Sequence, residues 1–204
     1  LRIIQEAHRL FSERGLILDA ALVDQEQRLL DAAFASDAEM EPLPEQPTDF
    51  VGRRREIDAI TGLLRSSRLV TIHGIGGSGK TRLAIHAART AGEPATCGFV
   101  DLAAARSNAH VESAFARGLG LPLTRLDGLD TDERVDALAD AAASSSGLLV
   151  IDNCEQVVAH VRTIVSRLLA RPGRLRMLAT SRVPLEVTGE RRYPVPQFTA
   201  AEEL

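Results

Sequence analysis

One stretch of the chain combines glycines, a lysine and a threonine at the spacing of a phosphate-binding loop. Residues 74–81 have the sequence Gly-Ile-Gly-Gly-Ser-Gly-Lys-Thr, which fits the pattern G-x-x-x-x-G-K-[ST] at every fixed position. Lys80 is the only lysine among the 24 basic residues of the chain. A flexible ammonium can reach between the β- and γ-phosphates of a nucleotide, whereas a planar guanidinium is too wide. The pattern therefore predicts nucleotide binding.

The residues of this stretch have different expected roles. The glycines let the backbone adopt positive φ and bring its N–H groups to phosphate oxygens, and the helix that follows adds its positive end. Lys80 is expected to neutralise the terminal phosphates, and the Thr81 hydroxyl to hold Mg²⁺. The alternative is a glycine-rich turn with an incidental lysine. The residues expected to bind the nucleotide here are Gly74, Gly76, Gly77, Ser78, Gly79, Lys80, Thr81 and Arg82.

Two further polar residues follow apolar runs. Asp152 ends the run 148–151, and a carboxylate there can reach the magnesium shell through water, although it could instead cap the next helix. Arg182 follows the run 175–180 and would face the γ-phosphate if that strand lies between the first and the third. We therefore predict Lys80, Asp152 and Arg182 as catalytic residues, and Thr81 and Asp152 as metal ligands.

The elements that position these residues alternate between strand and helix. Strands are expected at 69–73, 99–102, 148–151 and 175–180. A short fifth strand at 193–195 contains a proline, which confines it to an edge or an end. Helices are expected at 80–91, around 111–119, from 131 onwards, and from about 157 to the break at 171–173. This alternation predicts an α/β fold with right-handed crossovers and a parallel sheet covered on both faces.

The rest of the chain predicts a segmented organisation. Two apolar stripes within residues 1–36 indicate two helices, which are expected to end an upstream all-α domain. Residues 37–49 are acidic and proline-containing, so we interpret them as a linker. Residues 50–204 form the expected nucleotide-binding domain. Because the chain starts without a methionine and stops in a polar run, we interpret it as part of a longer protein.

Composition excludes several classes of function. The net charge is −4 and aromatic residues make up 3%, without a basic stripe, so we expect no direct grip on nucleic acid. Cys97 and Cys154 lack C-x-x-C spacing and are expected to be reduced thiols of a cytoplasmic protein. The histidines are scattered and predict no metal cluster. No apolar run is long enough for a membrane span.

Three more segments resemble a known family, the signal-transduction ATPases with numerous domains, which are related to the NB-ARC and AP-ATPase groups. Residues 50–53, Phe-Val-Gly-Arg, followed by Glu56, resemble the segment with which the family contacts adenine and ribose. Residues 152–155, Asp-Asn-Cys-Glu, resemble its magnesium strand, and residues 180–185 its sensor arginine segment. The resemblance covers residues 50–196 and adds Val51, Gly52 and Arg53 to the expected nucleotide-binding residues.

The resemblance implies a P-loop NTPase three-layer sandwich with strand order 5-1-4-3-2. It is closest to ATPase modules of bacterial transcriptional regulators, which implies ATP/ADP and Mg²⁺ as ligands and flanking domains of the same chain as partners. Self-association in the ATP state is a further expectation, and DNA is expected to be contacted only through domains outside this chain. Residues 1–36 resemble the last helices of a bacterial transcriptional activation domain.

One departure from the wider group bears on turnover. Fast ATPases place a glutamate directly after the magnesium aspartate to activate water, and this position is Asn153 here. Glu155 lies further along and is expected to point elsewhere, so we predict a slow ATPase that acts as a switch. Two alternatives are a small-molecule kinase, for which Arg125, Arg134 and residues 191–192 could supply lid arginines, and a purely structural sheet.

Overall fold

The computed structural model describes residues 40–46, 52–91 and 96–196, all of which belong to one compact unit. The helices expected within residues 1–36 lie outside these described residues, as does Val51. The domain boundaries expected at residues 36 and 49 therefore stay predictions.

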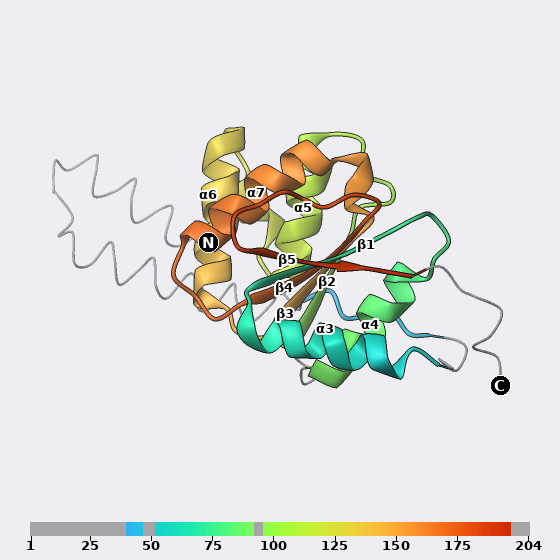
Figure 1. Cartoon of the computed structure of the whole chain (residues 1–204). Coiled ribbons are helices and arrows are strands. Elements are labelled where there is room, and N and C mark those ends of the chain that lie inside the picture. Colours follow the sequence, from blue (N-terminus) through green and yellow to red (C-terminus); the bar gives the residue numbers. More distant parts are fainter. Residues whose placement is uncertain (1–39, 47–51, 92–95, 197–204) are drawn as a thin grey trace, which may run out of the picture. The chain divides into compact units, whose positions relative to one another are not determined.

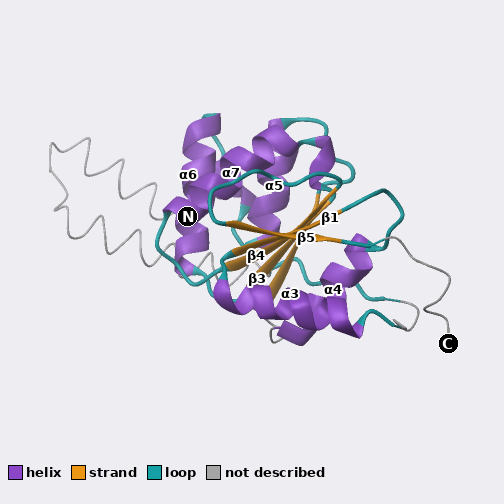
Figure 2. Ribbon diagram, in the orientation of Figure 1, coloured by secondary structure: helices purple, strands orange, loops and turns teal. Residues whose placement is uncertain are grey.

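Five parallel strands form one sheet in the middle of this unit (Figures 1 and 2). They are β1 (Leu69–His73), β2 (Cys97–Asp101), β3 (Leu148–Asp152), β4 (Arg176–Ser181) and β5 (Glu190–Pro194). The order β2-β3-β4-β1-β5 is the expected order counted from the other edge. β5 is an edge strand, which is one of the two positions that its proline allowed. Because β4 lies between β1 and β3, the residue after β4 is carried to the loop that follows β1.

Helices cover both faces of the sheet, which makes the fold the expected three-layer sandwich. α3 (Arg54–Ser66) and α4 (Lys80–Ala91) pack on one face, and α5 (Asn108–Gly118), α6 (Thr131–Ser144) and α7 (Val158–Ala170) on the other (Figure 1). α3 was not expected from the sequence, although Ile57, Ile60 and Leu64 recur at helical spacing. Within the described residues, no helix is long and apolar enough to cross a membrane.

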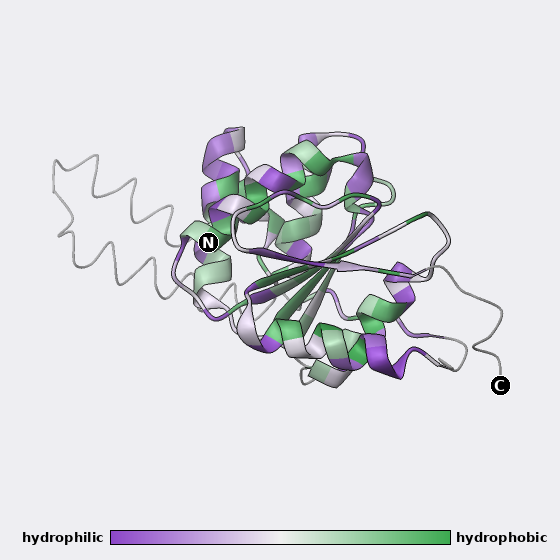
Figure 3. Ribbon diagram, viewed as in Figure 1, coloured by the Kyte–Doolittle hydropathy of each residue, from purple (hydrophilic) through white to green (hydrophobic). Residues whose placement is uncertain are grey.

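The strand side chains alternate between two apolar clusters, one on each face of the sheet. Leu148 and Val150 pack with residues of α3 and α4, whereas Leu149 and Ile151 pack with α5, α6 and α7. All of β3 is buried, as expected for an apolar strand that is covered on both faces. Figure 3 shows the hydrophobic residues concentrated along the strands other than β5 and on the helix sides that face them.

The described part of the expected linker, residues 40–46, contacts the edge strand β2. The Phe99 amide donates to the Glu41 carbonyl at 2.8 Å, and Pro42 forms an antiparallel bridge with Gly98. Leu43 packs against the apolar cluster of the α3–α4 face. The Arg117 Nε on α5 forms an ion pair with the Glu41 carboxylate at 3.3 Å. Backbone groups of this part of the segment are therefore paired with the sheet edge, and the expectation that residues 37–49 form a linker stays a prediction.

Candidate functional site

The candidate site is built around the loop of residues 74–79, called the phosphate loop below, which joins β1 to α4. Gly77 and Gly79 have φ values of 76° and 78°, in the left-handed region that favours glycine. The expectation of a positive φ at Gly76 was wrong, since Gly76 is not among the residues with positive φ. Its open side faces an arginine instead, because an added Cβ would lie 3.7 Å from Nη2 of Arg182.

Lys80 begins α4 and bends back over the phosphate loop. Its Nζ donates to the carbonyl oxygens of Gly74 at 2.9 Å and Ile75 at 2.7 Å, and the residue is only 9% exposed. Burial lowers the pKa of its ammonium, an effect that the Glu155 carboxylate opposes more strongly than Asp152 does. The ammonium therefore lies in the loop where terminal phosphates would bind, held by two carbonyls that an anion could replace.

Asp152 lies at the end of β3 and is 3% exposed. Its two carboxylate oxygens accept hydrogen bonds from the Thr81 hydroxyl at 2.8 and 3.0 Å, and Oδ1 also accepts from Thr180. Burial raises the pKa of Asp152, against the lowering effect of the Thr180 and Thr81 hydroxyls. Thr81 and Asp152 thus meet as predicted, although they are 71 residues apart in the chain.

This pair fits Mg²⁺ bound together with a nucleotide. The described residues contain no group of three or more His, Cys, Asp or Glu that could hold a metal by itself. Magnesium prefers oxygen ligands and keeps several waters, so one hydroxyl and one carboxylate suffice when phosphate oxygens complete the shell. The donor set is therefore right for Mg²⁺ and wrong for zinc or another metal that needs four protein ligands.

Arg182 follows β4 and reaches the phosphate loop, as expected from the strand order. Its Nε donates to Oε1 of Glu155 at 3.2 Å, and its side chain is 66% exposed. The expectation that Glu155 points elsewhere was wrong. Asn153 adopts the left-handed conformation with φ 62° and turns the chain, so that the short 3-10 helix Cys154–Gln156 directs Glu155 back towards Arg182.

Arg53 is the one arginine of the run 53–55 that is buried, at 8% exposure, whereas Arg54 and Arg55 are exposed. A Cβ on Gly79 would lie 3.8 Å from Nη1 of Arg53, so this guanidinium lies beside the phosphate loop. Gly52 precedes it with φ 82°, a conformation that favours glycine. Arg82 follows Thr81 on α4 and is half-buried. Contact of Gly52, Arg53 and Arg82 with a nucleotide stays a prediction.

Comparison with known proteins identifies the family to which this geometry belongs. Residues 49–180 match the profile of a family described as the AAA ATPase domain. The chain belongs to this family. The motifs had indicated a P-loop ATPase, and that interpretation is confirmed.

Relatives place this ATPase domain within longer proteins. A Mycobacterium tuberculosis protein provisionally named an HTH-type transcriptional regulator is 38% identical over 141 residues, 69% of this chain and 15% of that protein. An uncharacterised protein of the same organism is 32% identical over 158 residues, 76% of this chain and 39% of its own length. The chain therefore spans well under half of either relative.

A solved structure with the same fold is a Signal Transduction ATPase with Numerous Domains that carries a tetratricopeptide repeat sensor, from Pyrococcus horikoshii. Its TM-score is 0.60 at 20% identity, covering 80% of this chain and 26% of that one. This likeness confirms the sandwich fold. Together with the regulator name of the mycobacterial relative, it agrees with the resemblance to ATPase modules of transcriptional regulators.

Asp101 lies at the edge of the candidate site, although it was not in the expected set. It ends β2 beside Asp152 in the strand register, and its Oδ1 accepts from the Asn153 side-chain amide at 3.3 Å. The same Asn153 amide donates to Asp152 Oδ2 at 3.0 Å. A carboxylate at the end of a neighbouring parallel strand was the sequence signal that could have identified it, because these strand ends share one sheet edge.

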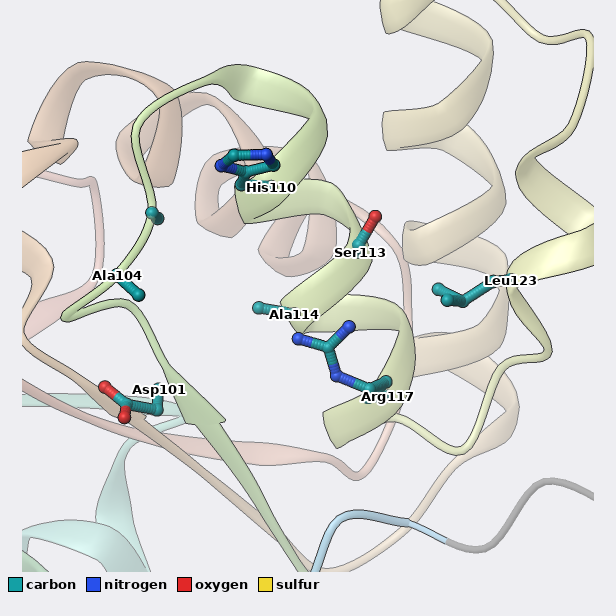
Figure 4. Close-up of a pocket in the computed structure, with 8 residues that line it drawn as sticks. Asp101, Ala104, His110, Ser113, Ala114, Arg117 and Leu123 are labelled. Atoms are coloured by element: carbon teal, nitrogen blue, oxygen red, sulfur yellow. The ribbon is translucent and has the colours of Figure 1, made fainter.

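Next to Asp101, the ATPase domain contains a cavity of about 420 Å³ that no residue of the phosphate loop lines. Figure 4 shows Asp101 at the end of β2 and Ala104 on the segment that leads into α5, with His110, Ser113, Ala114 and Arg117 along α5 itself. The lining residues are Asp101, Ala104, Ala105, His110, Ser113, Ala114, Arg117 and Leu123. Arg134, considered above as a lid residue of a kinase, instead donates to Glu112 at 3.4 Å between α6 and α5.

Proposed function

We propose that this domain binds ATP and ADP with Mg²⁺ at the phosphate loop and serves as the nucleotide switch of a longer cytoplasmic regulator. The observation that carries the proposal is the convergence of three strand ends on one loop. Lys80 follows the loop after β1, Asp152 ends β3, and Arg182 follows β4. The membership in the AAA ATPase domain family and the relative named as a transcriptional regulator support it.

Each residue would make a different contribution to nucleotide binding. Lys80 would exchange its two carbonyl partners for terminal phosphate oxygens, and the amides of the loop would bind the same phosphates. Thr81 and Asp152 would hold Mg²⁺, which when bound neutralises the developing charge on the phosphates. Arg53, beside Gly79, would contact the nucleotide from the side of the segment that precedes α3.

Arg182 would distinguish ATP from ADP by contacting the γ-phosphate. A ligand shifts a conformational equilibrium only by its differential affinity for the two states, so the switch needs a group that detects the third phosphate. The Arg182 guanidinium already faces the loop across Gly76. In the ATP state this contact would bias the packing of flanking domains or self-association, and slow hydrolysis would return the switch to ADP.

Calorimetric titration of Arg182→Ala with ATP and ADP tests the proposal. A hydrogen bond to a charged group contributes about 1.5–3 kcal/mol, and the high exposure of Arg182 favours the low end, so ATP affinity should fall about tenfold. ADP affinity should stay unchanged, and ATP-dependent assembly in sedimentation velocity should disappear. Arg54→Ala, a variant of an exposed arginine, is the matched control. Equal losses for ATP and ADP would contradict the role of Arg182, and binding unaffected by Lys80→Ala would contradict the site itself.

A further inference from the structure

Glu155 is a carboxylate at the phosphate loop that the proposed binding of nucleotide does not use. Its Oε1 accepts from Arg182 Nε at 3.2 Å, and its side chain is 20% exposed. Its other oxygen, Oε2, is buried and has no hydrogen-bond partner among the residues that the structure describes. A buried carboxylate oxygen without a partner is costly, so such a group in a native site calls for an explanation.

The local backbone holds Glu155 in this position. Asn153 takes the left-handed conformation, which asparagine tolerates better than glutamate does. Cys154 is fully buried in the cluster of the α5–α7 face, so the 3-10 helix is pinned to the core by this side chain. The next residue, Glu155, consequently reaches Arg182 beside the phosphate loop. Its charge acts to raise the pKa of the Lys80 ammonium, against the lowering effect of burial.

We propose that Glu155 is the base that activates the attacking water. It would take the role that fast ATPases give to a glutamate at the position of Asn153. This inference rests on the proposed binding of ATP. The Oε2 atom would accept a proton from water while the water oxygen forms a bond to the γ-phosphorus. The bond between the γ-phosphorus and the β–γ bridging oxygen breaks, and that oxygen keeps the electron pair as ADP leaves. Inorganic phosphate is released and Glu155 returns its proton to solvent.

Arg182 would act as a positioning residue for this base. A guanidinium is a rigid fork, so one arginine can bind a carboxylate and a phosphate at the same time. Its Nε donates a hydrogen bond to Glu155, and its Nη2 faces Gly76 of the phosphate loop. The group that detects the γ-phosphate would therefore also place the carboxylate, which ties hydrolysis to the presence of the third phosphate.

Single-turnover hydrolysis of γ-labelled ATP with Mg²⁺ by Glu155→Gln tests this inference. The substitution keeps the shape of the side chain and removes the base. We expect the rate to fall about 100-fold, the lower end of the usual contribution of general base catalysis. ATP and ADP affinities from calorimetry should stay within about twofold, because binding energy and the chemical step are separate quantities. Glu41→Gln is the matched control, because the Glu41 carboxylate is also paired with an arginine, Arg117 on α5, but lies outside the proposed site; this variant should hydrolyse like the wild type.

The outcomes separate this inference from the proposed function. A Glu155→Gln rate equal to that of the wild type would overturn the role of Glu155. Wild-type protein that binds ATP but hydrolyses none would also overturn it, while leaving the switch proposal in place. Protein that binds neither ATP nor ADP would refute the proposed function, on which the inference depends. A lost rate together with lost ATP affinity would assign Glu155 to binding and overturn its role as base.

Discussion

Replacement of Arg68 by alanine should destabilise the domain without affecting nucleotide binding. Arg68 lies between α3 and β1, at the end of the sheet opposite the phosphate loop. Its guanidinium donates to four carbonyl oxygens at and just beyond the end of α7. The acceptors are Leu168 at 3.2 Å, Leu169 at 3.2 Å, Arg171 at 2.9 Å and Leu175 at 3.4 Å. α7 ends at Ala170, and its C-cap residue Arg171 is extended and not left-handed, so these carbonyls depend on an outside donor.

The expected loss follows from these contacts. A hydrogen bond to a charged group contributes about 1.5–3 kcal/mol, and the positive charge of Arg68 also interacts favourably with the negative end of the α7 dipole. The four contributions do not add, because Arg68 is only half-buried and water can reach part of the carbonyls after its removal. We therefore expect a loss of about 3 kcal/mol, which lowers the melting temperature of a domain of this size by about 6–12 °C.

Urea unfolding followed by far-ultraviolet circular dichroism measures this loss. The chain has no tryptophan and one tyrosine, so intrinsic fluorescence is a poor probe. Arg68→Lys keeps the charge but reaches fewer carbonyls, and should recover about half of the stability. Arg65→Ala, on an exposed residue at the end of α3, should change stability by less than about 0.5 kcal/mol. An Arg68→Ala loss as small as that of Arg65→Ala would show that water satisfies the α7 carbonyls equally well.

Three further predictions concern the sheet, the metal carboxylate and the loop that carries Arg182. Gly98→Ala should leave little folded protein in a soluble-yield assay, because its Cβ would lie 2.0 Å from the Gly118 carbonyl oxygen. Gly62 on α3 has nothing within 4 Å of an added Cβ, so Gly62→Ala should instead stabilise the domain by about 0.5–1 kcal/mol. Burial raises the pKa of Asp152, so the folded state holds this proton at pH values where the unfolded chain has lost it. The stability of the wild type should therefore fall, relative to Asp152→Asn, as the pH rises from the ordinary aspartate pKa of 3.8 through the raised pKa. Urea unfolding of both proteins across that pH range measures this difference. A parallel pH dependence of the two proteins would contradict it. The Glu190 carboxylate accepts hydrogen bonds from the backbone amides of Leu185 at 2.7 Å and Glu186 at 3.0 Å, in the loop that follows Arg182. Glu190→Gln should therefore speed hydrogen exchange at residues 183–189 and weaken ATP binding more than ADP binding. Unchanged exchange would show that other contacts hold this loop.

The parts of the site that the sequence predicted are those with local signals. The phosphate loop and the two residues after it form one contiguous stretch, whose residue types supply backbone freedom, charge and a metal ligand. Its chemistry could therefore be predicted from residue types and spacing alone. Asp152 and Arg182 could be predicted because each follows an apolar run, and residues at strand ends meet at the carboxyl edge of a parallel sheet. The strand order from the family resemblance then placed Arg182 beside the loop.

Other parts had only weak local signals. Residues 40–46 contain prolines and charges typical of a linker, yet Glu41 and Pro42 pair with the edge of β2. Gly98, which bridges to Pro42, also has no side chain, and this permits the close packing of β2 against α5. Asp101 ends β2 beside Asp152, and its contact with the side-chain amide of Asn153 could not be read from the sequence.

The amino-acid sequence by itself determined the fold class and the presence of a loop suited to bind a polyphosphate, because apolar periodicity and glycine spacing act over short distances along the chain. Only the tertiary structure decided which way Glu155 points. Its direction results from the left-handed turn at Asn153, the burial of Cys154 and the charge of Arg182, which lies 27 residues further along the chain. These three influences come together only after the sheet has formed, since it is the adjacency of β3 and β4 that brings a carboxylate and a guanidinium to one side of the loop.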